Sequence, residues 1–533
     1  MRKPAKELCK SRRLSLGMIK CSFLAPFVLF ANIAFAETVE MDLSQLSKDQ
    51  LFQLYLESEE RNPRDVCHSA ELLSEMFDRG VFLGPIEEQM HRFGIDCAVN
   101  RRDWEQAYQH TLGLEKLFGK NPLSEVWGFT VARYAGKGTD AVDRLIALSQ
   151  ADTPDQLLQI ESDSIFRLSG SLHRNNQPDE ASRMFVALHD SPHFSRLEAA
   201  LQSVAASSVL KDRLKRGISP DAEELLLYVR SPYKYLEMLS DRSYENAWPA
   251  IEERAGKNLK LVLEDNLAFR KRQFELDKSN KKTKQELAHA LHFAGKFEEV
   301  IALTDSIDDS SEGRLEWDED DGWALNLRAY AFDAMGDIDK ADKVLDQFAS
   351  IPYLPSKNGW LVNFTINRAT RLVSQSRFAE GLAAANQAGE IALKSGSPYA
   401  KMLVWNAKAC AAFFLGKTEE AEENLRLVQD HEADSFVIAA ETYLCFGKHD
   451  KAAELAVKAL HDDTHRAEFI HAMRNPAFGV FYGETTLPTI YGVLRTNSQV
   501  DRAFTKFARD IPQKFTPMNA LRRAEIKAAL LPN

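Results

Sequence analysis

The chain has little cysteine and, beyond its first residues, no long hydrophobic run. Six cysteines occur among 533 residues, and only four of them lie beyond position 36. No stretch after position 36 approaches the about 20 continuous apolar residues that a membrane-spanning helix needs. We therefore expect the mature chain to be soluble, without an integral membrane span.

Signatures of several enzyme classes are also missing. The chain has no Gly-x-Ser-x-Gly elbow and no His-Glu-x-x-His motif. Leu415 to Thr418 reads like the end of a phosphate-binding P-loop, but Ala411 stands where the first glycine is required, and the motif lies on a repeat turn instead of after a strand. These absences favour a protein that is not an enzyme, with no catalytic residues and no cofactor.

Two groups of side chains could be taken for metal ligands. His461, His465, Glu468 and His471 have helical spacing, but no cysteine or second cluster completes a four-ligand site. The acidic stretch from Glu316 to Asp321 lacks the ligand order and closing glutamate of a calcium loop. We expect no metal, exposed polar residues at the first group, and the acidic start of a helix at the second.

The first 36 residues have the pattern of a secretory signal peptide. Residues 1 to 20 hold seven basic side chains and one acidic one, and an apolar run from Cys21 to Phe35 follows, with a small-x-small end at Ala34–Ala36. We expect export, with cleavage after Ala36. Met18 would begin a compact signal by itself, so the sequence leaves both Met1 and Met18 open as the translation start.

Negative charge dominates the remainder of the chain. Of 67 basic and 78 acidic residues, 60 and 77 lie beyond position 36, a net charge near −17. No basic stripe offsets this excess, and such a surface repels phosphate backbones. Nucleic acid is therefore not an expected partner.

A mark repeats along the chain at intervals of about 40 residues. A glycine or polar turn residue is followed five positions later by a small residue, and in the clearest copies another small residue precedes the turn by seven positions. Such residues let two antiparallel helices approach closely, and repetition lets each hairpin bury its apolar face on the next. The sequence predicts an all-α solenoid of helix hairpins. The clearest turn positions are Gly295, Gly336, Ser376, Gly416 and Gly447; looser ones are Arg102, Gly136, Asn176 and Gly217, and a further mark begins at Arg242.

The four remaining cysteines form two candidate pairs. Cys67 and Cys97 each lie fifteen residues from a turn near position 82, so an antiparallel hairpin brings them opposite each other. We predict a disulfide between them in an oxidising compartment, with two buried thiols as the alternative. Cys410 and Cys445 lie on first helices of successive repeats but four residues out of register, about 6 Å along the axis. The sequence leaves that second bridge open.

Two stretches resemble tetratricopeptide repeats, namely Ala329–Phe348 and Leu444–Ala459. In that family an aromatic or aliphatic residue follows the small residue of the first helix by three positions, and here Phe332 and Tyr443 hold that place. The resemblance covers residues 281 to 460 and implies a right-handed superhelix whose first helices line a concave, protein-binding face. Family spacing is about 34 residues, so the longer intervals here leave the curvature open.

The repeat marks and prolines divide the chain into five expected segments. Pro232 and Pro249 interrupt any long helix in the central part, because proline is tolerated chiefly in a first turn. Leu239–Gly256 resembles a stretch of secreted repeat proteins of Gram-negative bacteria, a likeness that implies no activity. From the signal peptide we expect a periplasmic location. The segments are a signal peptide at 1–36, degenerate repeats at 37–200, a helical bend with degenerate hairpins at 201–280, repeats at 281–460 and a helical cap at 461–533.

The resemblance also implies which side chains would contact a partner, because the exposed first-helix positions of the family can be carried over. Aromatic rings mixed with amides suit an extended peptide. His289 and His292 would make binding acid-sensitive, since imidazole titrates near pH 6 to 7. Phe413 and Phe414 occupy such positions too, where packing between repeats is an equal interpretation. The expected contact residues are Gln285, His289, His292, Trp323, Asn326, Tyr330, Asp333, Asn363, Thr370, Asn406 and Glu441.

Three functional hypotheses follow. The leading one is a periplasmic scaffold or adaptor that binds an extended peptide or a partner protein on its concave face. The alternative is an enzyme or a glycan-binding envelope protein whose site lies in the C-terminal tail or the central bend. The third is a subunit that only supports a larger complex. Capture of a terminal carboxylate is disfavoured, because Gln285 and His289 do not reproduce the Lys/Asn/Arg clamp of chaperone-tail binders.

Overall fold

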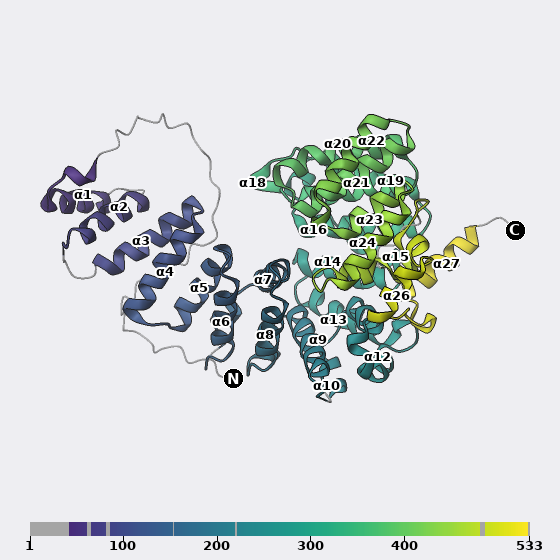
Figure 1. Ribbon diagram of the computed structural model, residues 1–533, viewed down its shortest axis with the longest axis horizontal. Coiled ribbons are helices and arrows are strands. Elements are labelled where there is room, and N and C mark those ends of the chain that lie inside the picture. Colours follow the sequence, from purple (N-terminus) through teal and green to yellow (C-terminus); the bar gives the residue numbers. More distant parts are fainter. Residues whose placement is uncertain are drawn as a thin grey trace, which may run out of the picture. The chain divides into compact units, whose positions relative to one another are not determined.

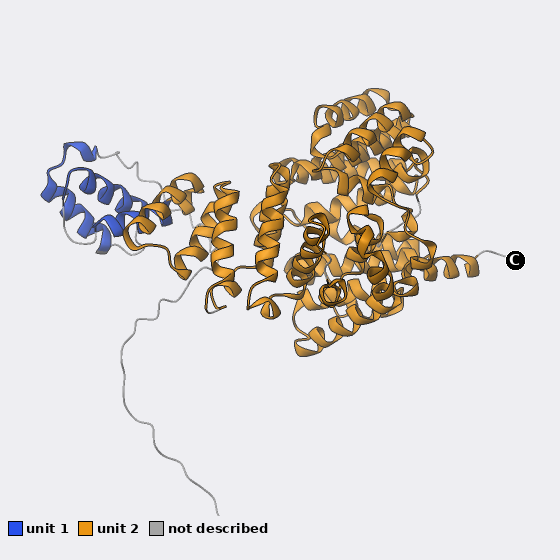
Figure 2. Ribbon diagram, turned by 60° about the horizontal axis from the view of Figure 1, so that its bottom comes forward, with its two compact units in different colours: residues 1–97 blue, residues 98–533 orange. Residues whose placement is uncertain are grey.

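The computed structural model describes residues 42–60, 65–81, 86–152, 154–218, 221–479 and 485–530. The expected signal peptide at 1–36 lies outside these ranges. The chain divides into two compact units, residues 1–97 and 98–533, which Figure 2 shows in different colours. Across the described ranges, no helix has both the length and the apolar character needed to cross a membrane.

The first unit is helical and has its own hydrophobic core, formed by Leu51, Leu72, Leu73 and Met76 among others. Its elements are η1 (Leu43–Gln45), α1 (Lys48–Glu60), α2 (Val66–Asp78) and most of α3 (Ile86–Arg101). A disulfide joins Cys67 of α2 to Cys97 of α3, with their Cα atoms 4.7 Å apart. The pairing predicted from the hairpin geometry is therefore present.

The second unit is built from helix hairpins (Figure 1). No β-strand occurs in the residues that the structure describes. The hairpins are α5 (Pro122–Tyr134) with α6 (Gly138–Ser149), α7 (Ser162–Arg174) with α8 (Pro178–His189), α14 (Lys281–Phe293) with α15 (Phe297–Thr304), α16 (Glu319–Ala334) with α17 (Ile338–Ala349), α19 (Leu361–Ser374) with α20 (Phe378–Ser395), α21 (Pro398–Phe414) with α22 (Thr418–Asp430), and α23 (Phe436–Cys445) with α24 (His449–His461). The other helices are α4 (Trp104–Phe118), α9 (Ala199–Lys215), α10 (Ala222–Leu226), α11 (Pro232–Ser240), α12 (Trp248–Ala255), α13 (Lys260–Leu276), α18 (Pro355–Asn358), α25 (Arg466–Ala472), α26 (Ser498–Phe507) and α27 (Met518–Leu530).

The turns between paired helices share one backbone conformation. All nine predicted turn residues from Arg102 to Gly447 have positive φ, between 57° at Asn176 and 80° at Gly336. The residue after the turn donates its N–H to a carbonyl five residues earlier, as Lys296 does to Leu291 at 3.0 Å. This left-handed helix ending satisfies a carbonyl that the helix leaves without a partner. The predicted all-α solenoid of hairpins is confirmed.

The mark that begins at Arg242 is the exception. Arg242–Ala247 forms a 3₁₀ helix, η4, and not a turn between paired helices. The Asp241 carboxylate accepts the Ser243 N–H at 2.8 Å and starts this helix. Pro232 and Pro249 do lie in the first turns of α11 and α12, as expected.

The small residues of the repeat mark lie where the helices cross. Ala288, Ala329, Ala341 and Ala452 are completely buried. At Gly381, an added Cβ atom would lie 2.6 Å from a methyl carbon of Val373. Larger side chains at these positions would separate the paired helices, because buried helix contacts are close-packed.

A second disulfide joins Cys410 of α21 to Cys445 of α23, with their Cα atoms 5.6 Å apart. The sequence left this bridge open because the two residues differ by four positions in their distance from their turns. Since the Cα atoms nevertheless come together, the turns at Gly416 and Gly447 do not lie level with each other across the two first helices.

The C-terminal tail covers the last repeat and then returns to the middle of the chain. Helix α26 packs on α24, as a cap would. Farther along, a β-bridge pairs Ala508 with Asp241, and the Arg509 N–H donates to the Ser240 carbonyl at 2.8 Å. Ile511 and Phe515 are buried in the same core as Trp248.

Arg509 holds this part of the C-terminal tail to the central helices through several contacts. Its guanidinium carbon lies 3.5 Å from the ring centroid of Trp248. It also donates to the carbonyl of Leu239 and to Glu252, each at 2.8 Å. Farther on, the Asn258 amide donates to the Thr516 carbonyl at 3.0 Å. Residues 508–516 are thus part of the central core.

The central helix α11 also lies beside α25. A hydrogen bond of 2.7 Å joins the Tyr233 hydroxyl to Nε2 of His471. The Arg474 Nε donates to the Ser240 hydroxyl at 3.1 Å. The chain between α11 and α25 therefore curves back, so that α25 lies beside α11.

Arg144 is the largest fully buried side chain of the chain's described part. Its guanidinium pairs with Glu115, with Glu125 at 3.2 Å and with Asp140 at 2.7 Å. Gly128 leaves room for it, because a Cβ atom there would lie 2.0 Å from the Arg144 Nη1. One buried cation thus connects α4, α5 and α6.

Candidate functional site

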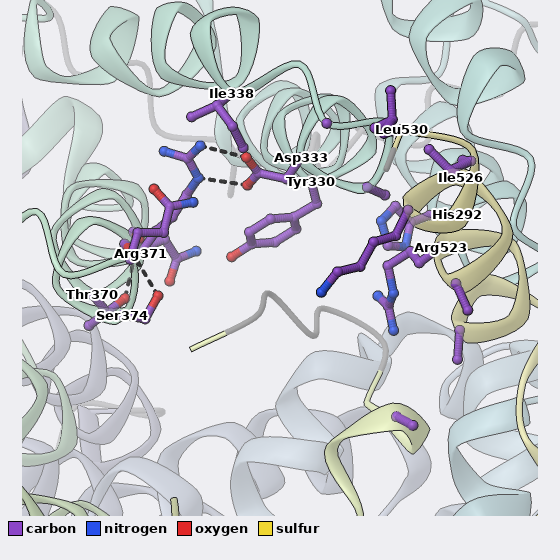
Figure 3. A pocket seen from close by; sticks show the side chains of 18 of the residues that line it. His292, Tyr330, Asp333, Ile338, Thr370, Arg371, Ser374, Arg523, Ile526 and Leu530 are labelled. Atoms are coloured by element: carbon purple, nitrogen blue, oxygen red, sulfur yellow. Dashed lines mark hydrogen bonds and ion pairs between the residues drawn. The ribbon is translucent and has the colours of Figure 1, made fainter. Parts of the chain in front are cut away.

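A cavity of about 850 Å³ lies in the second unit, beside the first helices α14, α16 and α19 (Figure 3). Four of the eleven predicted contact residues line it: His292 from α14, Tyr330 and Asp333 from α16, and Thr370 from α19. Helix α27 forms the opposite wall with Arg523, Ile526 and Leu530 among its lining residues. Successive first helices thus form one polar wall, as the resemblance implied, and the tail supplies the other.

An ion-pair network fixes the α16–α19 wall. Arg371 donates through Nε and Nη2 to the two carboxylate oxygens of Asp333, at 2.6 and 2.5 Å. Its Nη1 donates to Asp342 of α17 at 2.5 Å, and Asp342 also accepts from Arg377 at 2.6 Å. Burial raises the pKa of Asp333, and the Arg371 guanidinium opposes that shift. Two successive repeats are held in one register here.

Arg371 and the α27 residues were not predicted from the sequence. Arg371 directly follows the predicted Thr370 on α19 but was not among the positions carried over from the family. Arg523 and Ile526 belong to a tail that the sequence assigned to a cap. A search for arginines beside predicted contact positions would have found the first, whereas no local signal marks the α27 residues.

The pKa values of both predicted histidines lie well below the ordinary value of an imidazole. Burial lowers the pKa of His289 to about 4, with Arg270 adding to the effect. It lowers the pKa of His292 to about 3, with Arg523 adding to the effect. In the free protein neither imidazole therefore titrates near pH 6 to 7, and the two histidines do not supply the expected acid sensitivity of binding. The free energy lost when a charged imidazolium leaves water is larger than the free energy that its contacts in the protein supply.

Several other predicted residues connect neighbouring first helices. The Asn367 amide donates to Asn326 at 3.4 Å, and the Asn406 amide donates to Thr442 at 2.8 Å. The Trp323 ring packs edge-on against Phe364, with centroids 5.0 Å apart. These contacts hold adjacent repeats together.

The eleven predicted contact residues differ in their exposure to solvent. His292 and Asn326 are buried, and the other nine, which include Gln285 and Asn363, are half-buried. Asn363 donates to Glu319 at 3.4 Å. None of the eleven is fully exposed.

Phe413 and Phe414 pack between repeats. The Phe414 ring stacks on Phe378 at a centroid distance of 4.6 Å, and Phe413 lies 4.6 Å from Phe446. Both side chains remain 42% exposed. Both rings therefore take part in packing between repeats.

The residues first considered as metal ligands point to different neighbours. The His461 ring bonds to the carbonyl of Val457 at 2.9 Å, and the His465 ring lies 4.3 Å from Phe436. Glu468 accepts from Ser435 at 3.1 Å. Among the described residues, no group of three or more histidine, cysteine or acidic side chains could hold a metal ion.

The other two motifs have structural explanations. Asp318 caps α16 by accepting the Asp321 N–H at 3.0 Å, so the acidic stretch is the start of a helix, as expected. Gly416 has a φ of 71° and lies in the turn between α21 and α22. The P-loop-like residues thus form a repeat turn.

Glu441 is a half-buried carboxyl on α23. Burial, together with the negative charge of Glu468 of α25, raises the pKa of Glu441 from 4.5 to about 7. Tyr399 of α21 also faces these two carboxyls, and burial together with their charges raises the pKa of that phenol to about 12. At neutral pH the Tyr399 phenol is therefore protonated, and so is about half of the Glu441 carboxyl.

The Glu441 shift predicts a stability that depends on pH. Because the folded state holds this proton more tightly than the unfolded state, the contribution is complete below about pH 4.5 and is lost as the pH rises to 7. Glu441→Gln should therefore stabilise the protein at pH 8, by at most roughly 3 kcal/mol, and change little at pH 5. Urea unfolding at both pH values tests this. The exposed Glu454→Gln is the control, and an equal effect of Glu441→Gln at both pH values would contradict the prediction.

Comparisons with known proteins identify no family. No family model matches the chain, and no curated protein matches it. Among solved structures, yeast Tom70 matches at 11% identity, with a TM-score of 0.25, over 82% of this chain and 87% of that one. The Cut9–Hcn1 hetero-tetramer of the APC/C matches at 12% identity, with a TM-score of 0.22, over 87% of this chain and 97% of that one. At these TM-scores, neither likeness carries an argument about function.

Proposed function

We propose that this protein is a non-enzymatic scaffold of the periplasm, which binds a segment of a partner protein in the cavity beside α14, α16 and α19. The observation that supports this most is the convergence of His292, Tyr330, Asp333 and Thr370 on one cavity of about 850 Å³. Ligand-binding cavities commonly measure about 300 to 1,000 Å³. The four residues come from three successive first helices, the elements from which repeat proteins build a binding face.

The chemistry of the wall supports a polypeptide ligand. Amide and hydroxyl groups of Asn367, Thr370 and Ser374 line it together with the Tyr330 ring. Such groups can hydrogen-bond to polar side chains of a polypeptide, while a ring covers an apolar side chain. The Arg371–Asp333 pair holds two of these helices in place before any partner arrives, which reduces the ordering cost of binding.

The two disulfides support the location. Cys67–Cys97 and Cys410–Cys445 are both formed. Disulfides persist in oxidising compartments such as the bacterial periplasm and are rare in the cytosol. Together with the signal-peptide pattern, they support export.

Photo-crosslinking in intact cells tests the proposal. A benzoylphenylalanine at position 370 should form an adduct with one protein, because this position lines the cavity. The matched control has the same group at Lys343, an exposed residue of the second helix α17. Adducts from position 343 alone, or equally from both positions, would exclude the cavity as the binding face. Adducts from neither would favour the glycan-binding or enzymatic alternative.

A further inference from the structure

Helix α27 lies against the first helices that line the cavity, yet few of its side chains are buried. Of its residues, Met518 to Leu530, only Asn519 is buried, and Leu530 is 64% exposed. Arg522 pairs with Glu298 at 3.4 Å, but both side chains are exposed, so this pair contributes little to stability. The helix is held loosely compared with the chain before it.

The preceding residues are bound firmly. Arg509 makes the contacts with Trp248 and Glu252 described above, and Phe515 is 1% exposed. The change from firm to loose attachment falls between Thr516, whose carbonyl is bonded to Asn258, and Met518. Pro517 lies at this point and cannot donate a backbone hydrogen bond. Helix α27 can therefore leave its place without disturbing residues 508–516.

Four residues of α27 that lie near α14, α16 or the cavity share one side of the helix. Asn519, Arg523, Ile526 and Leu530 are spaced four, three and four residues apart, which places them on one side of a helix. Arg523, Ile526 and Leu530 line the cavity, and Ile526 also packs on the small core of α14 to α16. We call these four residues of α27 its stripe.

Two glycine turns let the helix approach. At Gly295, an added Cβ atom would lie 3.0 Å from the Met518 carbonyl oxygen. At Gly336, it would lie 2.8 Å from a methyl carbon of Leu530. The ends of α14 and α16 thus leave space that a helix backbone and its last apolar side chain occupy.

We infer that the surface formed by α14, α16 and α19 at the cavity is a docking site for an amphipathic helix. In the free protein α27 occupies this site. A partner helix with the same stripe binds there by displacing α27. The inference rests on the proposed function and names the form of the partner segment, a helix of about four turns and not an extended strand. The stripe would carry a polar residue, an arginine and two aliphatic residues at positions 1, 5, 8 and 12. Burial by α27 is small, so a partner helix with more apolar contact outcompetes it.

Displacement can be measured on the full chain with a synthetic peptide of residues 516–530 as the probe. Excess peptide should speed amide hydrogen exchange in α27 of the ¹⁵N-labelled protein, while α14 and α16 remain protected. A peptide with Ile526→Glu and Leu530→Glu is the matched control and should have no effect. Exchange in α27 as slow as in α14, with or without peptide, would overturn the inference.

A second measurement uses two variants of the full chain. Ile526→Glu weakens the resident helix, so the wild-type fluorescent peptide should bind that variant about 10- to 100-fold more tightly than the unchanged protein. Ala528→Glu, an exposed position outside the stripe, should leave peptide affinity unchanged. Equal affinity for all three chains, or no binding to any, would overturn the inference. A crosslink from position 370 would in that case still support the proposed function, so the two failures are distinguishable.

Discussion

Replacing Arg144 with alanine should lower the free energy of unfolding by about 3 to 5 kcal/mol. The substitution leaves Glu115, Glu125 and Asp140 around a buried space without their shared cation. Burial already raises the pKa of Glu125, so its charge is costly even with Arg144 present. Urea unfolding followed by circular dichroism measures the loss.

The matched control is Arg183→Ala. Arg183 also pairs with two carboxylates, Asp143 and Glu180, but its side chain is 42% exposed. An exposed pair contributes about 0 to 1 kcal/mol. Adding Glu115→Gln to Arg144→Ala should restore part of the lost stability, because it removes one unpaired charge. If Arg144→Ala cost no more than Arg183→Ala, the buried network would not have the importance given to it here.

Phe515→Ala should cost about 3 to 5 kcal/mol and release the tail. The ring is 1% exposed and lies in the core that also contains Tyr244, Trp248 and Ile251. Its removal leaves a cavity at the point where the tail returns to the central helices. Denaturant unfolding should show the loss, and limited proteolysis should find new cleavage near residues 508–516.

The neighbouring Lys514→Ala is the control for this experiment. Lys514 pairs with Glu252 at 2.8 Å, but its side chain is 56% exposed, so its loss should cost less than about 1 kcal/mol. Cleavage should not increase in this variant. Similar small effects of both variants would mean that residues 508–516 are not a part of the central core.

Residues of the repeat mark could be predicted because their signal is local. A glycine such as Gly336 lies within seven residues of Ala329 and within five of Ala341, and all three serve the same turn. The same reasoning failed at Arg242, where the spacing matches but Asp241 caps a 3₁₀ helix instead. A spacing rule cannot distinguish these outcomes without the second helix of the hairpin.

The candidate site was predicted in part. His292, Tyr330, Asp333 and Thr370 came together because α14, α16 and α19 are successive first helices. Asn406 is bound to Thr442 instead. Of the two histidines only His292 lines the cavity, and the burial that lowers both pKa values comes from packing that the sequence does not display.

By itself, the sequence determined the helix hairpins, their turns and the Cys67–Cys97 bridge, because each depends on residues about 40 positions apart or fewer. Only the tertiary structure decided the curvature and the return of the tail. Tyr233 meets His471 over 238 positions, and Arg509 meets Leu239 over 270. Small rotations between successive hairpins add up to such contacts. The total rotation depends on the packing of every repeat, so no local sequence pattern predicts it.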